Sequence, residues 1–262
     1  MAAVVFVSAL VTLAVEVFYT RLFAALFWKN TAFAILSLAM LGIGASGVLV
    51  YLRPSWFPRE RRGAQLAWQS IAFGLSIVGS YLWILELSKR SYNAMEPLSS
   101  YASLVAAGIV PFFFGGLVLS IVFTHAAERI SELYRLDLVG ASAGAVLVLP
   151  ALRVFNGPAL VPVLAFAAIA AGTWYARREK ARAAFLGGAF GAGLMVALFV
   201  AEAKYDVLAV THSHGHEETR IELERWDPLA RLTVEGFTPD FKWLNIDSQV
   251  VTPILRYSGD PR

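Results

Sequence analysis

Three histidines in the last quarter of the chain have a spacing that suits metal binding. His212, His214 and His216 alternate with small residues, so an extended backbone would place all three imidazoles on one face. With the carboxylates of Glu217 and Glu218 that follow, this face would suit zinc or another divalent ion. The same stretch is also typical of a solvated linker, because no residues that would orient metal ligands are evident beside it. Sequence alone leaves both interpretations open.

Two ionisable residues, Glu16 and Arg21, interrupt the first long apolar stretch. Charge within a membrane is costly and usually faces the protein interior or a water-filled cavity, so both are candidates for a transport role. On a helix the two side chains lie about 140° apart, so each needs a partner on another element. The structural alternative is that Glu16 is a hydrogen-bonded packing residue and that Arg21 extends toward the membrane surface.

A further carboxylate, Asp137, begins a helical face that continues with small residues. Gly140, Ala141 and Gly144 follow it at i+3, i+4 and i+7, and a face of this kind lets another helix approach closely. His125, at the end of the preceding apolar stretch, is the expected partner of Asp137. A carboxylate near a helix N-terminus is also stabilised by the helix macrodipole, so Asp137 has a structural interpretation beside a substrate or proton role.

These residues belong to a chain with the composition of an integral membrane protein. Of its 262 residues 58% are hydrophobic and 16% charged, and the mean hydropathy is +0.62. A bilayer core about 30 Å thick requires on the order of 20 apolar residues per helix. Seven stretches qualify, of which the fifth is the shortest: Val4 to Phe27, Thr31 to Leu52, Ala64 to Leu87, Ala102 to Phe123, Leu136 to Leu152, Pro158 to Tyr175 and Ala183 to Ala201. The sequence contains no cysteine, which excludes disulfides and thiolate chemistry.

Positive charges predict the orientation of this bundle in a cell (inner) membrane. Ten lysines and arginines lie in the loops after the second, fourth and sixth stretches, whereas the opposite loops carry four. By the positive-inside rule the N-terminus is cytoplasmic. Seven spans would place the C-terminal tail outside the cytoplasm, but a different number would reverse this, so the side of the tail stays open. The charges form no continuous basic face, which argues against nucleic acid as a partner and leaves the lipid bilayer as the environment.

The chain changes character after residue 203. We expect a transmembrane helical domain over residues 1–203, a histidine-containing linker over 204–219 and a β-strand segment over 220–262. A meander of roughly 40 residues is too small to fold alone, so we expect the strands to pair with another copy or another domain. The predicted strands are Arg220 to Leu223, Leu232 to Phe237, Lys242 to Ile246 and a stretch from Val250. The fold class is mainly α, a polytopic membrane helix bundle with a short C-terminal β-strand meander.

Several segments follow one pattern in a fixed order. They are E-x-x-x-T-R-L at Glu16 to Leu22, a glycine run at Leu41 to Gly47, Y-x-x-D-L-x-G-A-x-x-G at Tyr134 to Gly144, W-x-P-x-x-R-x-x-V at Trp226 to Val234, a strand and turn at Trp243 to Ser248, and Val251 to Ile254. Together they resemble the membrane-embedded spermidine synthase-like family, in which a multi-helix domain precedes an aminopropyltransferase-type Rossmann domain. The resemblance covers nearly the whole chain, although Ser248 replaces the glycine of the family's turn.

The resemblance implies a substrate-side role for the strands. In soluble spermidine synthases this region forms part of a lid, and the gap between it and the cofactor domain holds a polyamine and decarboxylated S-adenosylmethionine. By resemblance, Asp247 and Gln249 are the nearest candidates for contact with substrate. No strand followed by a glycine-rich turn and a helix appears after Tyr257. We therefore expect no cofactor in this chain, decarboxylated S-adenosylmethionine on a missing domain, and no aminopropyltransferase activity from the chain alone.

Three functions are compatible with these features. The first is a polyamine-related membrane anchor, partner of a separately encoded catalytic chain. The second is a small transporter or channel-like unit for a cationic solute such as a polyamine, with a cavity lined by Glu16, Arg21 and Asp137. The third is a structural membrane subunit, alone or as a homo-oligomer, that docks a partner by edge pairing of its strands.

Overall fold

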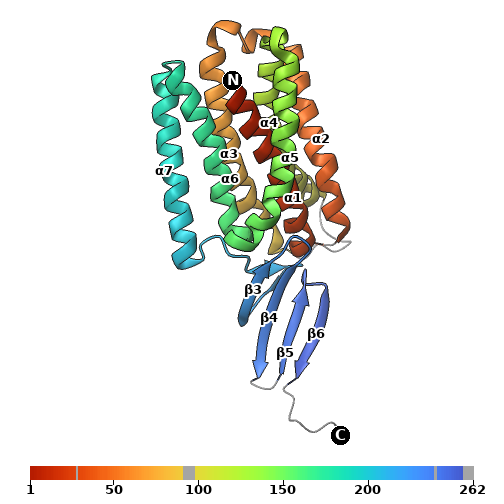
Figure 1. The fold of residues 1–262 in the computed structure, drawn as a ribbon. Coiled ribbons are helices and arrows are strands. Elements are labelled where there is room, and N and C mark those ends of the chain that lie inside the picture. The colour runs from red at the N-terminus through yellow and green to blue at the C-terminus, as the bar shows by residue number, and fades with distance from the viewer. Residues whose placement is uncertain (28, 91–97, 239–240, 256–262) are drawn as a thin grey trace.

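The structure, a computed structural model, describes residues 1–262 except 28, 91–97, 239–240 and 256–262. In this part of the chain, seven long helices form a bundle with a four-stranded sheet at one end (Figure 1). The helices are α1 (Ala2–Leu26), α2 (Lys29–Leu52), α3 (Arg62–Ser88), α4 (Leu98–His125), α5 (Ile130–Phe155), α6 (Gly157–Arg178) and α7 (Arg182–Tyr205). Short 3-10 turns lie at Pro54–Trp56, Arg59–Arg61 and Ala127–Arg129.

All seven helices are long and apolar enough to cross a membrane, which confirms the seven predicted stretches. The fifth helix extends beyond the predicted residues at both ends, because polar residues continue it past its apolar part. Large apolar side chains on α2, α5 and α7 point outward, as expected of surfaces that face lipid. These features support a multi-pass membrane protein.

Helix α1 lies at the centre of the bundle, in contact with α2, α4, α5 and α6. Phe18, Tyr19 and Leu22 are fully buried, as expected for an apolar helix that other helices surround. The hydroxyl of Tyr19 donates a hydrogen bond of 3.1 Å to the carbonyl of Ile77 on α3, so the phenol is paired within the core.

Helices α1 and α5 run parallel and approach each other closely. Gly140 lies against the backbone of Phe6 and Gly144 against that of Leu10, so near that a methyl group at either glycine would overlap a backbone carbonyl. This contact confirms the predicted close approach of the small-residue face. It also sets the register of the two helices, in which Asp137 lies level with the start of α1.

The C-terminal sheet is an antiparallel meander in the order β3-β4-β5-β6. Its strands are β3 (Ile221–Trp226), β4 (Arg231–Thr238), β5 (Phe241–Ile246) and β6 (Val250–Leu255), which confirms the predicted strands up to residue 255. The end of the predicted segment, residues 256–262, lies outside the described residues. Between β5 and β6, Asp247 and Ser248 both have positive φ, near 50°, so Ser248 adopts the left-handed conformation that glycine would favour.

The sheet packs on the helix bundle of its own chain, at the end opposite the N-terminus (Figure 1). The side chain of Trp226 is 1% exposed and contacts the ring of Phe18 on α1 and Gly157 at the start of α6. A methyl group at Gly157 would lie 2.5 Å from the indole, so glycine is required for this contact. The meander therefore obtains from the bundle the apolar contacts that its size prevents it from forming alone.

Candidate functional site

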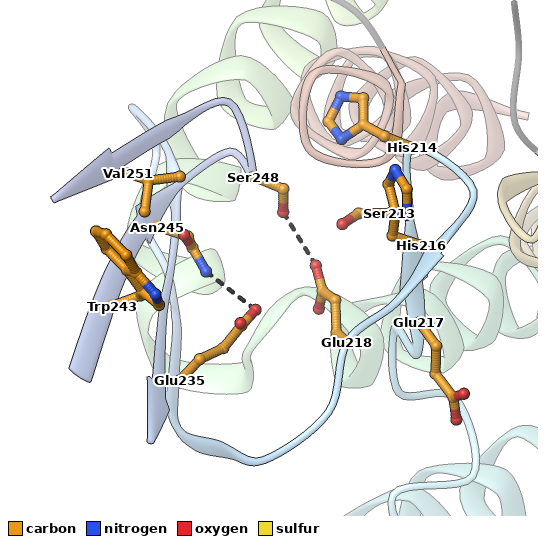
Figure 2. A pocket seen from close by; sticks show the side chains of 10 residues that line it. All are labelled: Ser213, His214, His216, Glu217, Glu218, Glu235, Trp243, Asn245, Ser248 and Val251. Carbon is orange, nitrogen blue, oxygen red and sulfur yellow. Dashed lines mark hydrogen bonds between the residues drawn. The ribbon is translucent and has the colours of Figure 1, made fainter. Parts of the chain in front are cut away.

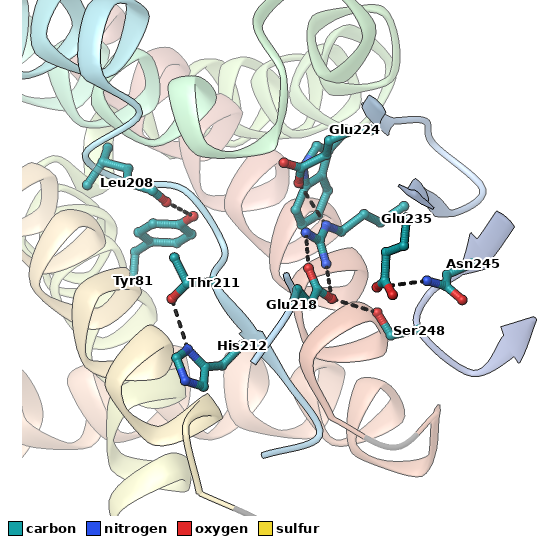
Figure 3. A network of polar contacts seen from close by, with 11 residues as sticks. Tyr81, Leu208, Thr211, His212, Glu218, Glu224, Glu235, Asn245 and Ser248 are labelled. Atoms are coloured by element: carbon teal, nitrogen blue, oxygen red, sulfur yellow. Dashed lines mark hydrogen bonds and ion pairs between the residues drawn. The ribbon is translucent and has the colours of Figure 1, made fainter. Parts of the chain in front are cut away.

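The centre of the junction between sheet and bundle is a buried arginine. The side chains of Arg231 and Glu218 are 1% and 5% exposed, and two N–H groups of the guanidinium donate to the two carboxylate oxygens at 2.8 and 2.7 Å. The Nε of Arg231 donates to Glu224 at 2.8 Å, and the indole N–H of Trp226 donates to the same carboxylate oxygen. Figure 3 shows this network beside the end of the bundle. The charge of the buried arginine is therefore compensated by two carboxylates.

The turn between β5 and β6 completes this centre. The backbone N–H of Arg231 donates to Asp247 at 2.8 Å, and the hydroxyl of Ser248 donates to Glu218 at 3.0 Å. The side-chain amide of Gln249 donates to the carbonyls of Ala24 and Phe27, at the C-terminal end of α1. Asp247 and Gln249, the residues that the family resemblance assigns to substrate, thus make structural contacts in this chain, and their contact with substrate stays a prediction.

Arg21 also contacts the sheet. Its guanidinium donates a hydrogen bond of 2.7 Å to the carbonyl of Leu229, in the turn between β3 and β4. Arg153 of α5 forms an ion pair of 2.8 Å with Asp227 of the same turn. Two basic residues at the ends of membrane helices therefore bind the turn that follows Trp226. Arg21 thus has a partner in the sheet, and its extension toward the membrane surface stays a prediction.

The histidine stretch is a hairpin and not an extended strand. The strands β1 (His212–Ser213) and β2 (His216–Glu217) pair antiparallel, and His214 lies in the turn with a φ of 52°. The extended backbone on which the metal interpretation depended is therefore absent. Among the described residues, no group of three or more histidine, aspartate and glutamate side chains is placed to hold a metal ion. The imidazole of His214 instead contacts the carbonyl of Phe27, with Nε2 at 2.9 Å.

A cavity of about 330 Å³ lies between this hairpin and the sheet (Figure 2). Figure 2 shows the carboxylates of Glu218 and Glu235 directed toward its interior, with the ring of Trp243 at its edge. The amide of Asn245 donates to Glu235 at 3.0 Å. The lining residues are Ser213, His214, His216, Glu217, Glu218, Glu235, Trp243, Asn245, Ser248 and Val251.

The two inward carboxylates of this cavity differ in their electrostatics. Burial by itself would raise the pKa of Glu218, but the hydrogen bonds and positive charge of Arg231 outweigh it and hold that pKa below the usual value. Glu235 forms no ion pair with Arg231, so burial and the negative charge of Glu218 outweigh the more distant arginine and raise the pKa of Glu235. A cation placed beside Glu235 would therefore stabilise its ionised form.

A second cavity, of about 390 Å³, lies on the other side of Glu218. Its acidic lining residues are Glu202, Asp206, Glu218, Glu222 and Glu224. The carboxylate of Glu202 is buried and accepts a hydrogen bond of 2.6 Å from the backbone N–H of Leu208, which fixes the connection between α7 and the hairpin. Tyr81 of α3 donates to the carbonyl of Leu208 at 2.8 Å (Figure 3). The junction between sheet and bundle thus has a cavity with acidic lining residues on each side of the ion pair between Arg231 and Glu218.

The chain has no match among known protein families, curated proteins or solved structures. These comparisons therefore give no support to the family resemblance of its motifs.

Asp137 lies far along the bundle from Glu16 and from Arg21, which follows Glu16 on α1. In the register set by Gly140 and Gly144, Asp137 and Glu16 are separated by about 20 Å along the helix axes. The structure thus separates Asp137 from Glu16 and Arg21, and a transport role of these residues stays a prediction. His125 does not bind Asp137 in the described structure, and its Nε2 instead lies 2.8 Å from the carbonyl of Phe57.

Sequence reasoning missed Glu235 and Trp243 as members of the site. Arg231, Thr233 and Glu235 lie at i, i+2 and i+4 of β4, and this spacing places them on one face of a strand. That signal was present in the sequence. What it could not indicate is that this face of β4 meets Glu218, in the segment after the histidine hairpin.

Proposed function

We propose that the chain is the membrane-embedded part of a spermidine synthase-like protein. Its bundle holds an aminopropyltransferase-type strand sheet at one membrane surface. The sheet forms the amine-binding side of a site whose other side is a cofactor-binding Rossmann unit that carries decarboxylated S-adenosylmethionine. The unit is either a separately encoded chain or a further part of the same protein.

The observation that carries this proposal is that the motif segments contact one another. Arg21, in the first motif, donates to Leu229 in the W-x-P-x-x-R segment. The glycines of the Y-x-x-D-L-x-G-A-x-x-G segment pack on Phe6 and Leu10, on the same helix as the first motif but before it. Asp247, in the strand and turn motif at Trp243 to Ser248, accepts from the backbone N–H of Arg231. Segments that lie far apart in the sequence therefore form one unit that couples the bundle to the sheet, which supports a shared origin of the pattern.

The cavity beside the hairpin supports an amine as the ligand. Glu235 forms no ion pair within the described structure, and the negative charge of its neighbour Glu218 acts against the more distant positive charge of Arg231. A protonated amine would compensate this charge, and the ring of Trp243 offers a cation–π contact. An extended di- or triamine also suits a junction with acidic residues on both sides of Glu218.

The orientation of the sheet is part of the proposal. The N-terminus and the sheet lie at opposite ends of seven spans (Figure 1). The excess of lysine and arginine in the loops at the N-terminal end favours a cytoplasmic location for that end. The sheet and its cavity would then face the outside of the cytoplasm.

The test begins with the coding DNA beyond the Arg262 codon and in the adjacent reading frames. We expect it to encode a strand, a glycine-rich turn and a helix. The membrane chain and that unit are then reconstituted together in vesicles with decarboxylated S-adenosylmethionine and putrescine, and release of methylthioadenosine is measured. Absence of such a coding segment, or a reconstituted pair that releases none, would overturn the proposal.

A further inference from the structure

The turn between α6 and α7, at the end of the bundle away from the sheet, contains a separate cavity of about 250 Å³. Arg177 and Lys180 line it from the end of α6, and Arg182 lines it from the start of α7. Its remaining lining residues are apolar: Ala176, Ala181 and Phe185. Three cationic side chains thus converge on a small space beside an apolar surface.

Glu179, the acidic residue of this turn, contacts another helix. Glu179 packs against the start of α3, where its side chain lies 2.7 Å from the position that a Cβ of Gly63 would occupy. Arg178 does not line the cavity. Its guanidinium lies over the ring of Trp174, 4.3 Å from the ring centre. Within the described part of the chain, no ion pair involves Arg177, Lys180 or Arg182. These three side chains are therefore available to bind an anion.

The backbone of the turn adds to the positive electrostatic potential at this cavity. Carbonyl groups at the end of α6 are already bonded, since Ala176 accepts from Ala181 and Arg177 accepts from Lys180. Helix α7 begins at Arg182 without a side-chain cap from Ala181. The first turn of this 24-residue helix thus presents the positive end of its dipole beside the three cations.

The residue at the centre of the turn has a backbone conformation that favours glycine. Lys180 has a φ of 54°, and Lys in this region is strained whereas Gly is not. A lysine here provides an ammonium group beside Arg177 and Arg182 that the usual glycine would lack.

From this cavity we propose a binding site for a phosphate-bearing anion, supplied by the headgroup of an anionic phospholipid. The three cations bind the phosphate, and Phe185 contacts the apolar part of the lipid. The position at the end of two membrane helices favours a lipid over a soluble anion, because the bilayer surface lies at this level. This site is independent of the proposed enzyme-related function.

Native mass spectrometry of the delipidated full chain in detergent tests the site, with phosphatidylglycerol, phosphatidylcholine and inorganic phosphate as probes. We expect phosphatidylglycerol to bind at least about fivefold more tightly than phosphatidylcholine, since each basic residue near the surface adds attraction for anionic lipid. The triple variant Arg177→Gln, Lys180→Gln, Arg182→Gln should lose this preference. A control with the same change of charge at the same end, Arg53→Gln, Arg59→Gln, Arg135→Gln, should keep it.

The variant Lys180→Gly separates loss of the site from loss of the fold. It relieves the strained backbone, so its thermal midpoint should not fall, yet its preference for phosphatidylglycerol should decrease. No preference in the wild type, or an equal loss in the control variant, would overturn the site. If inorganic phosphate binds as tightly as phosphatidylglycerol, a soluble phosphate is the ligand and the lipid assignment is wrong.

Discussion

Arg231 and Glu218 form a two-point ion pair between strand β4 and the segment after the histidine hairpin, with both side chains almost completely buried. The pair lies where the sheet meets the bundle, next to Trp226. Its position makes the attachment of the sheet depend on electrostatics as well as on apolar packing.

Removal of one partner of this pair should detach or destabilise the sheet. In Glu218→Gln the buried guanidinium keeps only Glu224 as a charged partner, and a broken buried pair costs about 3 to 5 kcal/mol. Arg231→Lys should also be damaging, because an ammonium cannot make both parallel hydrogen bonds. Limited proteolysis of the 204–219 connector in detergent measures the effect.

The control for this change is Lys242→Gln, which removes a more exposed ion pair with Glu222. Such pairs contribute at most about 1 kcal/mol, so its proteolysis rate should stay near that of the wild type. Equal sensitivity of Glu218→Gln and Lys242→Gln would contradict the importance of the buried pair.

The contact between α1 and α5 should be intolerant of a single methyl group. Gly144→Ala places a Cβ against the backbone of Leu10 and forces the helices apart, at a cost of about 1 to 3 kcal/mol. Gly193→Ala on α7 meets open space, so the higher helix propensity of alanine should leave stability unchanged or slightly raised. Thermal unfolding in detergent compares the two variants, and a similar midpoint for both would argue against tight packing at Gly144.

The docking of the sheet should weaken in mild acid through His214. Burial lowers the pKa of His214 from its ordinary 6.5, although the carbonyl of Phe27 and the charge of Glu218 act in the opposite direction and His216 adds to the lowering. Because the folded state binds its proton less readily than the unfolded state, the contribution to stability is complete above pH 6.5 and is lost as the pH falls through the lowered value. Proteolysis of the connector should thus stay constant from about pH 7.5 to pH 6.5 and accelerate as the pH falls below 6.5.

Two observations distinguish the titration of His214 from the titration of other groups at the junction. His214→Gln should remove most of the pH dependence over this interval. The pKa of Glu218 is also lowered, but its contribution is complete above 4.5 and is lost only at lower pH. A wild-type profile that is flat down to pH 5 would show that His214 does not titrate at the junction.

Binding of an amine in the cavity should depend on Glu235. We expect Glu235→Gln to weaken spermidine binding to the purified chain by about tenfold, since a hydrogen bond to a charged group contributes about 1.5 to 3 kcal/mol. Glu60→Gln removes the same charge from an exposed position in the loop before α3 and should have no effect. Equilibrium dialysis with labelled spermidine measures both, and an equal response of the two variants would exclude a specific cavity.

The sequence by itself determined the seven spans and the strands. A bilayer leaves the backbone no water to bind, so a spanning segment must be a long apolar helix, and this requirement is visible in composition alone. The strands were visible because their alternating residues and turn signals are local, as at Leu232 to Phe237. Close packing at Gly140 and Gly144 was also predictable, because the spacing of small residues follows directly from helix geometry.

Only the tertiary structure decided which of these elements meet. It placed Arg21 on the turn after Trp226, bent the histidine stretch into a hairpin, and brought Glu218 to Arg231. Each of these contacts depends on the three-dimensional path of the chain, since Arg21 and Leu229 are 208 residues apart. The apolar contacts of Trp226 with Phe18 and Gly157 bring such distant residues together, and periodicity along one segment carries no information about a partner on another.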